Sequence, residues 1–304
     1  MSLAGKKVVV TGGAGFIGSH LCQRLLEQKA DVLVIDDFST GKRELLPDGV
    51  MFERMDICSK NVGKIIQDFE PDIIIHLAAI HYIPYCNSNP ERTFDVNIMG
   101  TRNLLEAYRD AELFLFASSA AVYPPVSGPL TEDMYGPIDI YGKTKLIGED
   151  LVKLYYQNNA VITRIFNVYG PNDTNPHVIP EILSQVKRGK RKIELGNLSP
   201  RRDFIHVEDV CEAIIALLKH GKGGTYNIGT GKEYSVKDIV DLMSEILGEK
   251  VQVVQVEERM REVERMHLLA DISKIQNETG WKPKIELKEG LKGLIDSLSG
   301  KEDL

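Results

Sequence analysis

The segment Thr11-Gly12-Gly13-Ala14-Gly15-Phe16-Ile17-Gly18 decides the fold, because it directly follows the apolar run Lys7–Val10 and opens an amphipathic stretch that reaches Gln28. Glycines at positions 12, 15 and 18 permit a tight turn, a close backbone approach to phosphate and close packing of a helix on a strand. The free N–H groups and the dipole at the start of a helix favour a bound anion. The segment therefore predicts a pyrophosphate-binding turn, lined by Gly12, Gly15, Phe16, Ile17 and Gly18.

An acidic residue stands where such a turn needs one to recognise the cofactor. Asp36 follows the apolar run Val32–Ile35 and lies 18 residues after Gly18. A carboxylate at this position accepts hydrogen bonds from both hydroxyls of an adenosine ribose and repels a 2′-phosphate. The pattern favours NAD over NADP. The alternative is a structural turn followed by a solvated aspartate.

Apolar runs alternate with helical patterns throughout the first half of the chain. After the first two runs come Ile73–Leu77, Leu113–Phe116 and Val161–Ile165. Continuous apolar strands separated by helices are typical of a parallel sheet that is covered on both faces. The sequence therefore predicts an α/β fold built on a Rossmann-type, doubly wound parallel sheet.

The texture of the sequence changes after Asn167, where proline, glycine and asparagine become frequent. We expect a smaller, mixed α/β substrate domain here, with a strand over Val251–Val254 and a helix over about Ser235–Leu247. Ser235 is the expected N-cap of that helix. We assign residues 1–166, with about 203–228 returning, to the NAD-binding domain. Residues 167–202 and 229–304 form the substrate domain.

The composition argues against several classes of partner. The 304 residues include 37 Lys and Arg against 44 Asp and Glu, and a net charge of −7 gives no general attraction to nucleic acid. The four cysteines are widely spaced and form no metal-ligand pairs, so we expect reduced thiols and no bound metal. The apolar runs are too short to span a bilayer, and the residues before Lys7 lack the pattern of a signal peptide. We expect a soluble, cytoplasmic protein without membrane or nucleic-acid partners.

Tyr141-Gly142-Lys143-Thr144-Lys145 is the second strong signal, because a spacing of four places Tyr141 and Lys145 on one face of a helix. An ammonium group beside a phenol stabilises the phenolate, lowers the pKa of the tyrosine and creates a general base for a hydroxyl proton. Ser119 ends the run that begins at Leu113, at the sheet edge where open α/β folds bind ligands. Taken singly, these residues have plain alternatives: a pair on a surface helix, and a small polar residue at a strand end.

Together these motifs resemble the extended short-chain dehydrogenases/reductases of the nucleotide-sugar epimerase/dehydratase group, from about Lys7 to about Trp281. The resemblance implies that Ser119, Tyr141 and Lys145 form a catalytic triad. It implies further cofactor contacts by Asp56, Ile57, Leu77, Ala78 and Ala79. Asn97 matches a family asparagine whose main expected role is a buried hydrogen bond.

Motifs of the second half resemble the family segments that hold the diphosphate of a nucleotide-sugar. The resemblance places Asn167 in one such segment and Arg202 in another, with Arg201 as an alternative to Arg202. Arg259, followed by Glu262-Val263, stands where a second phosphate-binding arginine is expected. Two guanidinium groups bind a diphosphate locally, which a chain of negative net charge requires.

Two histidines are expected to contact the substrate. Pro176–Pro180 resembles the segment of GDP-fucose synthase that contains an acid histidine, which implicates His177 and Val178 in substrate binding. In that enzyme the histidine works together with a cysteine in epimerisation at C3 and C5. The cysteine position corresponds to Ala121 here, so this chain lacks one of the two groups. His81 occupies a position where 4-epimerases often have lysine. The alternative for His177 is a loop or helix-cap histidine.

The reaction is indicated by two alanines. Dehydratases of the group have an Asp-Glu pair directly after the catalytic hydroxyl and decarboxylating relatives have a nearby Glu, whereas this chain has Ala120 and Ala121. Because alanine transfers no proton, the resemblance favours a nucleotide-sugar 4-epimerase of the UDP-glucose/UDP-galactose type, acting through a transient 4-keto sugar. The alternatives are a nucleotide-sugar reductase or other epimerase of a deoxysugar or heptose pathway, and a non-catalytic NAD-binding sensor.

Two helices have apolar residues on more than one stripe. One contains Tyr141 and continues through Leu146, Ile147, Leu151, Val152, Leu154 and Tyr155; the other covers about Asp95–Tyr108. By resemblance, both helices pair with their copies in a second subunit and form a homodimer. The alternative is that they are buried within one subunit.

Overall fold

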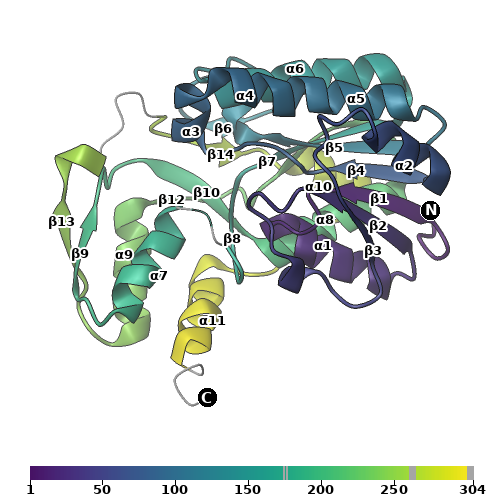
Figure 1. Ribbon diagram of the computed structural model, residues 1–304. Coiled ribbons are helices and arrows are strands. Elements are labelled where there is room, and N and C mark those ends of the chain that lie inside the picture. Colours follow the sequence, from purple (N-terminus) through teal and green to yellow (C-terminus); the bar gives the residue numbers. More distant parts are fainter. Residues whose placement is uncertain (174, 176, 260–264, 300–304) are drawn as a thin grey trace.

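The computed structural model describes residues 1–173, 175, 177–259 and 265–299. Its centre is a seven-stranded parallel sheet with the strand order β11-β7-β5-β4-β1-β2-β3 (Figure 1). The α/β fold with a doubly wound parallel sheet is confirmed. The strands of this sheet are β1 (Lys7–Thr11), β2 (Asp31–Asp36), β3 (Met51–Arg54), β4 (Ile73–His76), β5 (Leu113–Ser119), β7 (Ala160–Ile165) and β11 (Gly224–Ile228).

Helices cover both faces of this sheet because successive strand residues are buried on opposite sides. Val8 and Val10 of β1 belong to one core cluster, whereas Val9 belongs to another. The first face is covered by α1 (Phe16–Glu27), α8 (Val207–His220) and α10 (Ser273–Thr279). The second is covered by α2 (Val62–Phe69), α5 (Thr101–Ala107) and α6 (Ile140–Tyr156). The edge strand β3 was not expected from the sequence, because its four residues are all exposed and form no apolar run.

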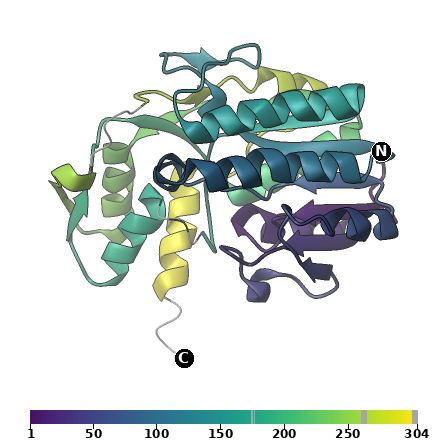
Figure 2. The ribbon, with the colours of Figure 1, turned by 45° about the horizontal axis from the view of Figure 1, so that its top comes forward.

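The smaller part of the molecule lies beyond the carboxyl ends of the large sheet (Figures 1 and 2). Its three-stranded sheet has the order β12-β10-β8, and a parallel pair β13-β9 lies beside it. These strands are β8 (Asn167–Tyr169), β9 (Lys192–Leu195), β10 (Arg201–His206), β12 (Glu233–Ser235) and β13 (Gln252–Gln255). The helices α7 (Val178–Lys187), α9 (Val236–Leu247) and α11 (Leu287–Ser299) contribute to a third core cluster. Ser235 caps α9 in a capping box with Asp238, which confirms the expected N-cap.

The chain passes between the two parts several times. β11 returns to the large sheet, while β10, at the start of the range assigned to the NAD-binding domain, lies in the small sheet. β14 (Leu269–Ala270) pairs with β6 (Pro129–Leu130), so the C-terminal third of the chain is attached to the segment after β5. The division into two domains by residue ranges stays a prediction.

The remaining elements are short. α3 (Ile83–Ser88), α4 (Pro90–Phe94) and the π-helical turn η2 (Asp95–Gly100) lead into α5, so the helix expected over Asp95–Tyr108 is present and changes type at Thr101. The 3-10 turns are η1 (Arg43–Leu45), η3 (Ala120–Val122), η4 (Gln157–Asn159) and η5 (Glu257–Arg259). Among the described residues, no helix has the length and apolarity to cross a membrane. The four cysteines carry free thiols.

Candidate active site

A cavity of about 1780 Å³ lies at the carboxyl ends of the central strands, between the large sheet and the smaller part. A volume well above the usual range of small-molecule pockets leaves room for two large ligands side by side. The position agrees with the rule that open α/β sheets bind ligands where the strand order reverses, here next to β1. The cofactor, catalytic and substrate residues assigned from the sequence line this cavity, namely Gly12, Gly15, Phe16, Ile17, Gly18, Asp36, Asp56, Ile57, Leu77, Ala78, Ala79, His81, Ser119, Tyr141, Lys145, Asn167, His177, Val178, Arg202 and Arg259. Arg201, the alternative to Arg202, does not line it.

The glycine turn is shaped for a close backbone approach. Gly12 has a φ of +72°, and a Cβ there would lie 2.7 Å from the backbone nitrogen of Ala78. A Cβ on Gly18 would lie 2.2 Å from the carbonyl oxygen of Gly12. Gly15 is the N-cap of α1, and no described side chain caps this helix. The backbone N–H groups of its first turn therefore face the cavity side as donors for a phosphate group.

Two carboxylates line the end of the cavity where the adenosine of a dinucleotide would lie. Asp36 is 7% exposed and accepts hydrogen bonds from the backbone N–H groups of Ala14 (3.0 Å) and Phe38 (2.8 Å). Burial raises the pKa of Asp36, and the two N–H groups oppose that rise. Asp56 accepts from the N–H of Cys58 and pairs with Arg92 at 2.7 Å. These fixed acceptors and the glycine turn fit an NAD molecule.

The structure brings Ser119, Tyr141 and Lys145 to one place. Lys145 is buried, its Nζ donates to the carbonyl of Ala117 at 2.7 Å, and it lies 5.9 Å from the centroid of the Tyr141 ring. Ser119 ends β5, and its hydroxyl accepts from the N–H of Ala121. The structure therefore places Tyr141 and Lys145 on one helix and Ser119 at the end of β5, as the sequence predicts.

The electrostatics of this group differ from the expectation in one respect. Burial raises the pKa of Tyr141, and the hydrogen bond with Ser119 lowers it by less. Burial also lowers the pKa of Lys145 to about 7. In the protein alone, desolvation of the phenol outweighs the hydrogen bond with Ser119, so the pKa of Tyr141 lies above its usual range. A lowered pKa in the cofactor-bound site stays a prediction, in which the positive charge of an oxidised nicotinamide ring would add to that of Lys145.

Buried polar contacts connect β5 and α6, the elements that contain Ser119 and Tyr141, to their neighbours. Glu149 of α6 accepts from the hydroxyl of Ser118 at 2.6 Å and pairs with Arg164 of β7 at 2.8 Å. Asn97 donates to Thr144 of α6 and to the carbonyl of Ile80, and accepts from the N–H of Ile80. Asn97 thus makes the buried hydrogen bonds expected of it.

The arginines at the substrate side differ in their surroundings. Arg202 lines the cavity and donates to the carbonyl of Arg201, whereas Arg201 points to Glu233 (3.2 Å) and Asp238 (3.3 Å). The geometry therefore favours Arg202 over Arg201 for a phosphate contact. Arg259 lines the cavity and pairs with Glu181 at 2.8 Å. Glu262 and Val263, the residues expected to follow it in the motif, lie outside the described residues.

The two histidines expected to contact the substrate are neighbours. The ring centroids of His81 and His177 are 5.9 Å apart. His81 contacts the side-chain oxygen of Asn175 at 3.1 Å, and His177 pairs with Asp173 at 3.2 Å. Burial, followed by the nearby His177 and Lys145, lowers the pKa of His81. His177 occupies the N-cap position of α7 but makes no cap hydrogen bond with its side chain, and Pro176 lies outside the described residues.

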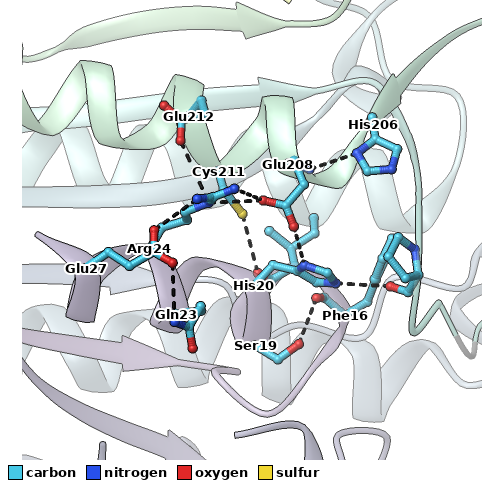
Figure 3. A network of polar contacts seen from close by, with 12 residues as sticks. Phe16, Ser19, His20, Gln23, Arg24, Glu27, His206, Glu208, Cys211 and Glu212 are labelled. Atoms are coloured by element: carbon cyan, nitrogen blue, oxygen red, sulfur yellow. Dashed lines mark hydrogen bonds and ion pairs between the residues drawn. The ribbon is translucent and has the colours of Figure 1, made fainter. Parts of the chain in front are cut away.

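A polar network attaches the cofactor-binding helix to the segment after β8 (Figure 3). His20 of α1 contacts Glu208 of α8 at 2.7 Å and the carbonyl oxygen of Pro171 at 3.1 Å. Arg24 of α1 also donates to Glu208, at 2.7 Å and 3.0 Å. The network therefore links α1, which follows the glycine turn, with α8 and with Pro171, two residues after β8.

A buried arginine of the cavity wall was not expected from the sequence. Arg265 lines the cavity, is 7% exposed and pairs with Asp139, the N-cap residue of α6, at 2.8 Å. Its partner is 126 residues away in the chain, and no local pattern marks the pair. Only the tertiary structure reveals it.

Comparison with known proteins gives three kinds of match. The model of the family described as "NAD dependent epimerase/dehydratase family" matches residues 8–229. A UDP-glucose 4-epimerase of Lactobacillus helveticus is 33% identical over 92% of this chain and 93% of its own length. Relatives with other reactions are similarly close. A GDP-6-deoxy-D-mannose reductase of Pseudomonas aeruginosa is 29% identical (95% and 96% covered), and UDP-glucuronic acid decarboxylase 6 of Arabidopsis thaliana is 31% identical (94% and 86%).

Solved structures match over nearly the whole chain. The UDP-glucose 4-epimerase of Thermotoga maritima with UDP-glucose has a TM-score of 0.91 at 29% identity, covering 98% of this chain and 100% of that one. The UDP-glucose 4-epimerase of Thermus thermophilus in complex with NAD has a TM-score of 0.89 at 32% identity, covering 97% and 99%.

Proposed function

This chain belongs to the NAD-dependent epimerase/dehydratase family and uses NAD, and from that premise we propose that it is a nucleotide-sugar 4-epimerase of the UDP-glucose/UDP-galactose type. The observation that carries the proposal is the meeting of Ser119, Tyr141 and Lys145 in the cavity that contains the glycine turn. A base, a cofactor site and a substrate site in one cavity are what reversible oxidation of a sugar hydroxyl requires.

The residues of the chain have distinct parts in the proposed reaction. Gly12, Gly18 and Asp36 would hold the cofactor, and bound NAD supplies an acceptor for hydride from C4 of the sugar. Tyr141 takes the proton of the C4 hydroxyl and later returns it. Lys145 stabilises the negative charge on the phenol, and Ser119 donates a hydrogen bond to the reacting oxygen.

The absence of a second acid after Ser119 supports epimerisation over the reactions of the related decarboxylases and dehydratases. Ala120 and Ala121 form the short turn η3 directly behind the catalytic serine. Their methyl groups transfer no proton, so neither loss of water nor loss of carbon dioxide has its acid there.

Polar residues of the smaller part are placed to hold the substrate. We assign the diphosphate to Asn167, Arg202 and Arg259, because guanidinium groups bind phosphate in a bidentate manner. His81, His177 and Val178 are assigned to the sugar side. Firm binding of the nucleotide with looser binding of the sugar lets a 4-keto intermediate turn before it is reduced on its other face.

The test of this function needs only the purified protein. We expect conversion of UDP-galactose to UDP-glucose, or of another 4-epimeric pair, without added reductant, and mass spectrometry should detect co-purified NAD. Absence of conversion across UDP-, GDP-, CDP- and dTDP-sugars would contradict the proposal.

A reductase is the second candidate, favoured by the 29% identity to a GDP-6-deoxy-D-mannose reductase. His177 lines the cavity and pairs with Asp173, which gives the site a group able to donate a proton to a keto sugar. A reductase consumes reduced cofactor in equal amount to product, so net oxidation of NADH or NADPH with a 4-keto nucleotide-sugar distinguishes it from an epimerase. A non-catalytic NAD-binding sensor would turn over none of these compounds.

We further propose that the protein is a cytoplasmic homodimer. α6 and the α4–η2 segment expose apolar side chains, namely Phe94 (43%), Met99 (41%), Ile147 (42%) and Leu154 (71%). Exposed apolar groups on neighbouring helices are typical of a subunit interface. Sedimentation at micromolar concentration should give a dimer of about twice the 34.0 kDa chain, and a clean monomer contradicts the assembly.

A further inference from the structure

Arg265 connects the two segments that supply the catalytic side chains. Its Nη1 donates to the carboxylate of Asp139 at 2.8 Å, and its Nη2 donates to the carbonyl oxygen of Ala121 at 2.9 Å. Asp139 in turn accepts from the N–H of Gly142 at 2.7 Å and so caps the helix that contains Tyr141. Ala121 donates its N–H to the hydroxyl of Ser119. The guanidinium group of Arg265 is therefore connected to Ser119 through Ala121, and to the start of the helix that contains Tyr141 through Asp139.

The backbone around Arg265 is attached to the strand that contains Arg202. The carbonyl of Met266 accepts from the N–H of Arg201 at 2.8 Å, and the carbonyl of Leu268 accepts from the N–H of Asp203 at 2.8 Å. Arg202 lies between these two points on β10 and lines the cavity. A side chain on this backbone is thus fixed relative to the proposed diphosphate site.

Stability alone does not account for a buried arginine in this position. The side chains of Arg265 and Asp139 are 7% and 9% exposed, so both charges have lost most of their hydration. The Nε of Arg265 is buried and has no hydrogen-bond partner among the described residues. A buried ion pair with an unsatisfied donor is often no more stable than a well-packed apolar pair. A role in the geometry and charge of the site explains the pair better.

We propose that Arg265 is a positioning residue of the catalytic site: it neutralises Asp139 and holds the turn after Ser119, so that Tyr141 can act as the base. This inference rests on the proposed function for its meaning, but the charge arrangement exists without a sugar substrate. Asp139 stands two residues before Tyr141, and its negative charge opposes formation of the phenolate. Pairing with Arg265 reduces that opposition.

The charged and polar groups around Tyr141 determine whether its pKa rises or falls when Arg265 is removed. Ser119 approaches it from β5, Cys86 from α3, Lys145 from the next turn of α6 and Asp139 from the start of α6. Cys86 and Asp139 raise the pKa of Tyr141 and the hydrogen bond of Ser119 lowers it, after the larger effect of burial. His81, from the segment after β4, acts on the site through its charge interaction with Lys145. Removal of Arg265 leaves the carboxylate of Asp139 without its cation, so we expect the pKa of Tyr141 to rise.

The experiment measures the ionisation of Tyr141 directly in the NAD-bound protein. The ultraviolet absorbance of the phenolate is titrated, and the same titration of Tyr141→Phe is subtracted. For Arg265→Met we expect the titration midpoint to rise by about one pH unit relative to the unsubstituted protein, the size typical of a nearby uncompensated charge. Arg265→Met combined with Asp139→Asn should remove most of that shift, because asparagine keeps the helix cap without the charge.

Arg265→Lys separates charge from geometry and provides a variant that keeps the ion pair. Its single ammonium group can neutralise Asp139 but cannot also present a rigid fork to Ala121. We expect the titration of Tyr141 to move little, with kcat about tenfold lower and KM nearly unchanged. An unshifted titration in Arg265→Met overturns the proposal, as does a shift that persists in the double variant. If no nucleotide-sugar reacts but the titrations behave as described, the epimerase assignment fails and the role of Arg265 stands.

Discussion

Replacing Tyr141 by Phe is expected to reduce epimerase turnover by about 10²–10⁴-fold, the usual contribution of a positioned acid–base group. The substitution removes one oxygen atom from a half-buried ring whose neighbours are Ser119 and Lys145. Phenylalanine has nearly the same shape, so the cavity and the glycine turn should remain intact. The rate of interconversion of the 4-epimeric pair measures the loss, and NAD retained after gel filtration shows that the cofactor site is preserved.

Tyr135→Phe is the matched control, since it makes the same chemical change at a tyrosine that is 67% exposed and outside the cavity wall. Its turnover should equal that of the unsubstituted protein. Turnover of Tyr141→Phe within a factor of two of the control would remove the proposed base. Turnover lost together with NAD would assign Tyr141 to cofactor binding instead.

Glu149→Gln is expected to lower the free energy of unfolding by about 3–5 kcal/mol, the usual cost of leaving one charge of a buried pair without its partner. The side chains of Glu149 and Arg164 are 0% and 3% exposed, and two guanidinium nitrogens of Arg164 donate to the carboxylate at 2.8 Å and 2.9 Å. Glutamine keeps one acceptor oxygen but removes the negative charge. Chemical denaturation followed by circular dichroism measures the change.

Two further variants separate charge from packing at this site. Lys153 also pairs with Glu149, at 3.5 Å, but its side chain is 45% exposed, so Lys153→Met should cost less than about 1 kcal/mol. Combining Glu149→Leu with Arg164→Met removes both buried charges and should recover most of the loss. A Glu149→Gln variant as stable as the Lys153→Met variant would show that the buried pair contributes little.

The placements that the sequence predicted and the structure confirms are those of residues within one strand, turn or helix. Gly12 and Gly18 act within a single strand–turn–helix unit, and Tyr141 and Lys145 lie one turn apart on α6. Their relative positions follow from helix and turn geometry, so spacing alone is informative. The strands of the large sheet that form apolar runs could also be predicted, because a strand buried on both faces has apolar residues at successive positions.

Other features depend on contacts between distant residues and could not be predicted. Arg265 and Asp139 are 126 residues apart, and His20 and Pro171 are 151 apart. Neither pair lies within one element, so no periodicity relates its members. The edge strand β3 was not predicted for another reason, because its exposed residues form no apolar pattern. The direction of the pKa shift of Tyr141 depends on how deeply the phenol is buried, and the sequence does not show this.

The sequence by itself determined the doubly wound sheet, the glycine turn at the start of α1 and the placement of Tyr141 and Lys145 on one helix. These are properties of short segments, in which backbone geometry fixes how neighbouring side chains lie. Only the tertiary structure decided that Arg202 rather than Arg201 faces the cavity, that burial dominates the ionisation of Tyr141, and that Arg265 pairs with Asp139. Desolvation and long-range ion pairing depend on what surrounds a group in space, and that is set by packing of the whole chain.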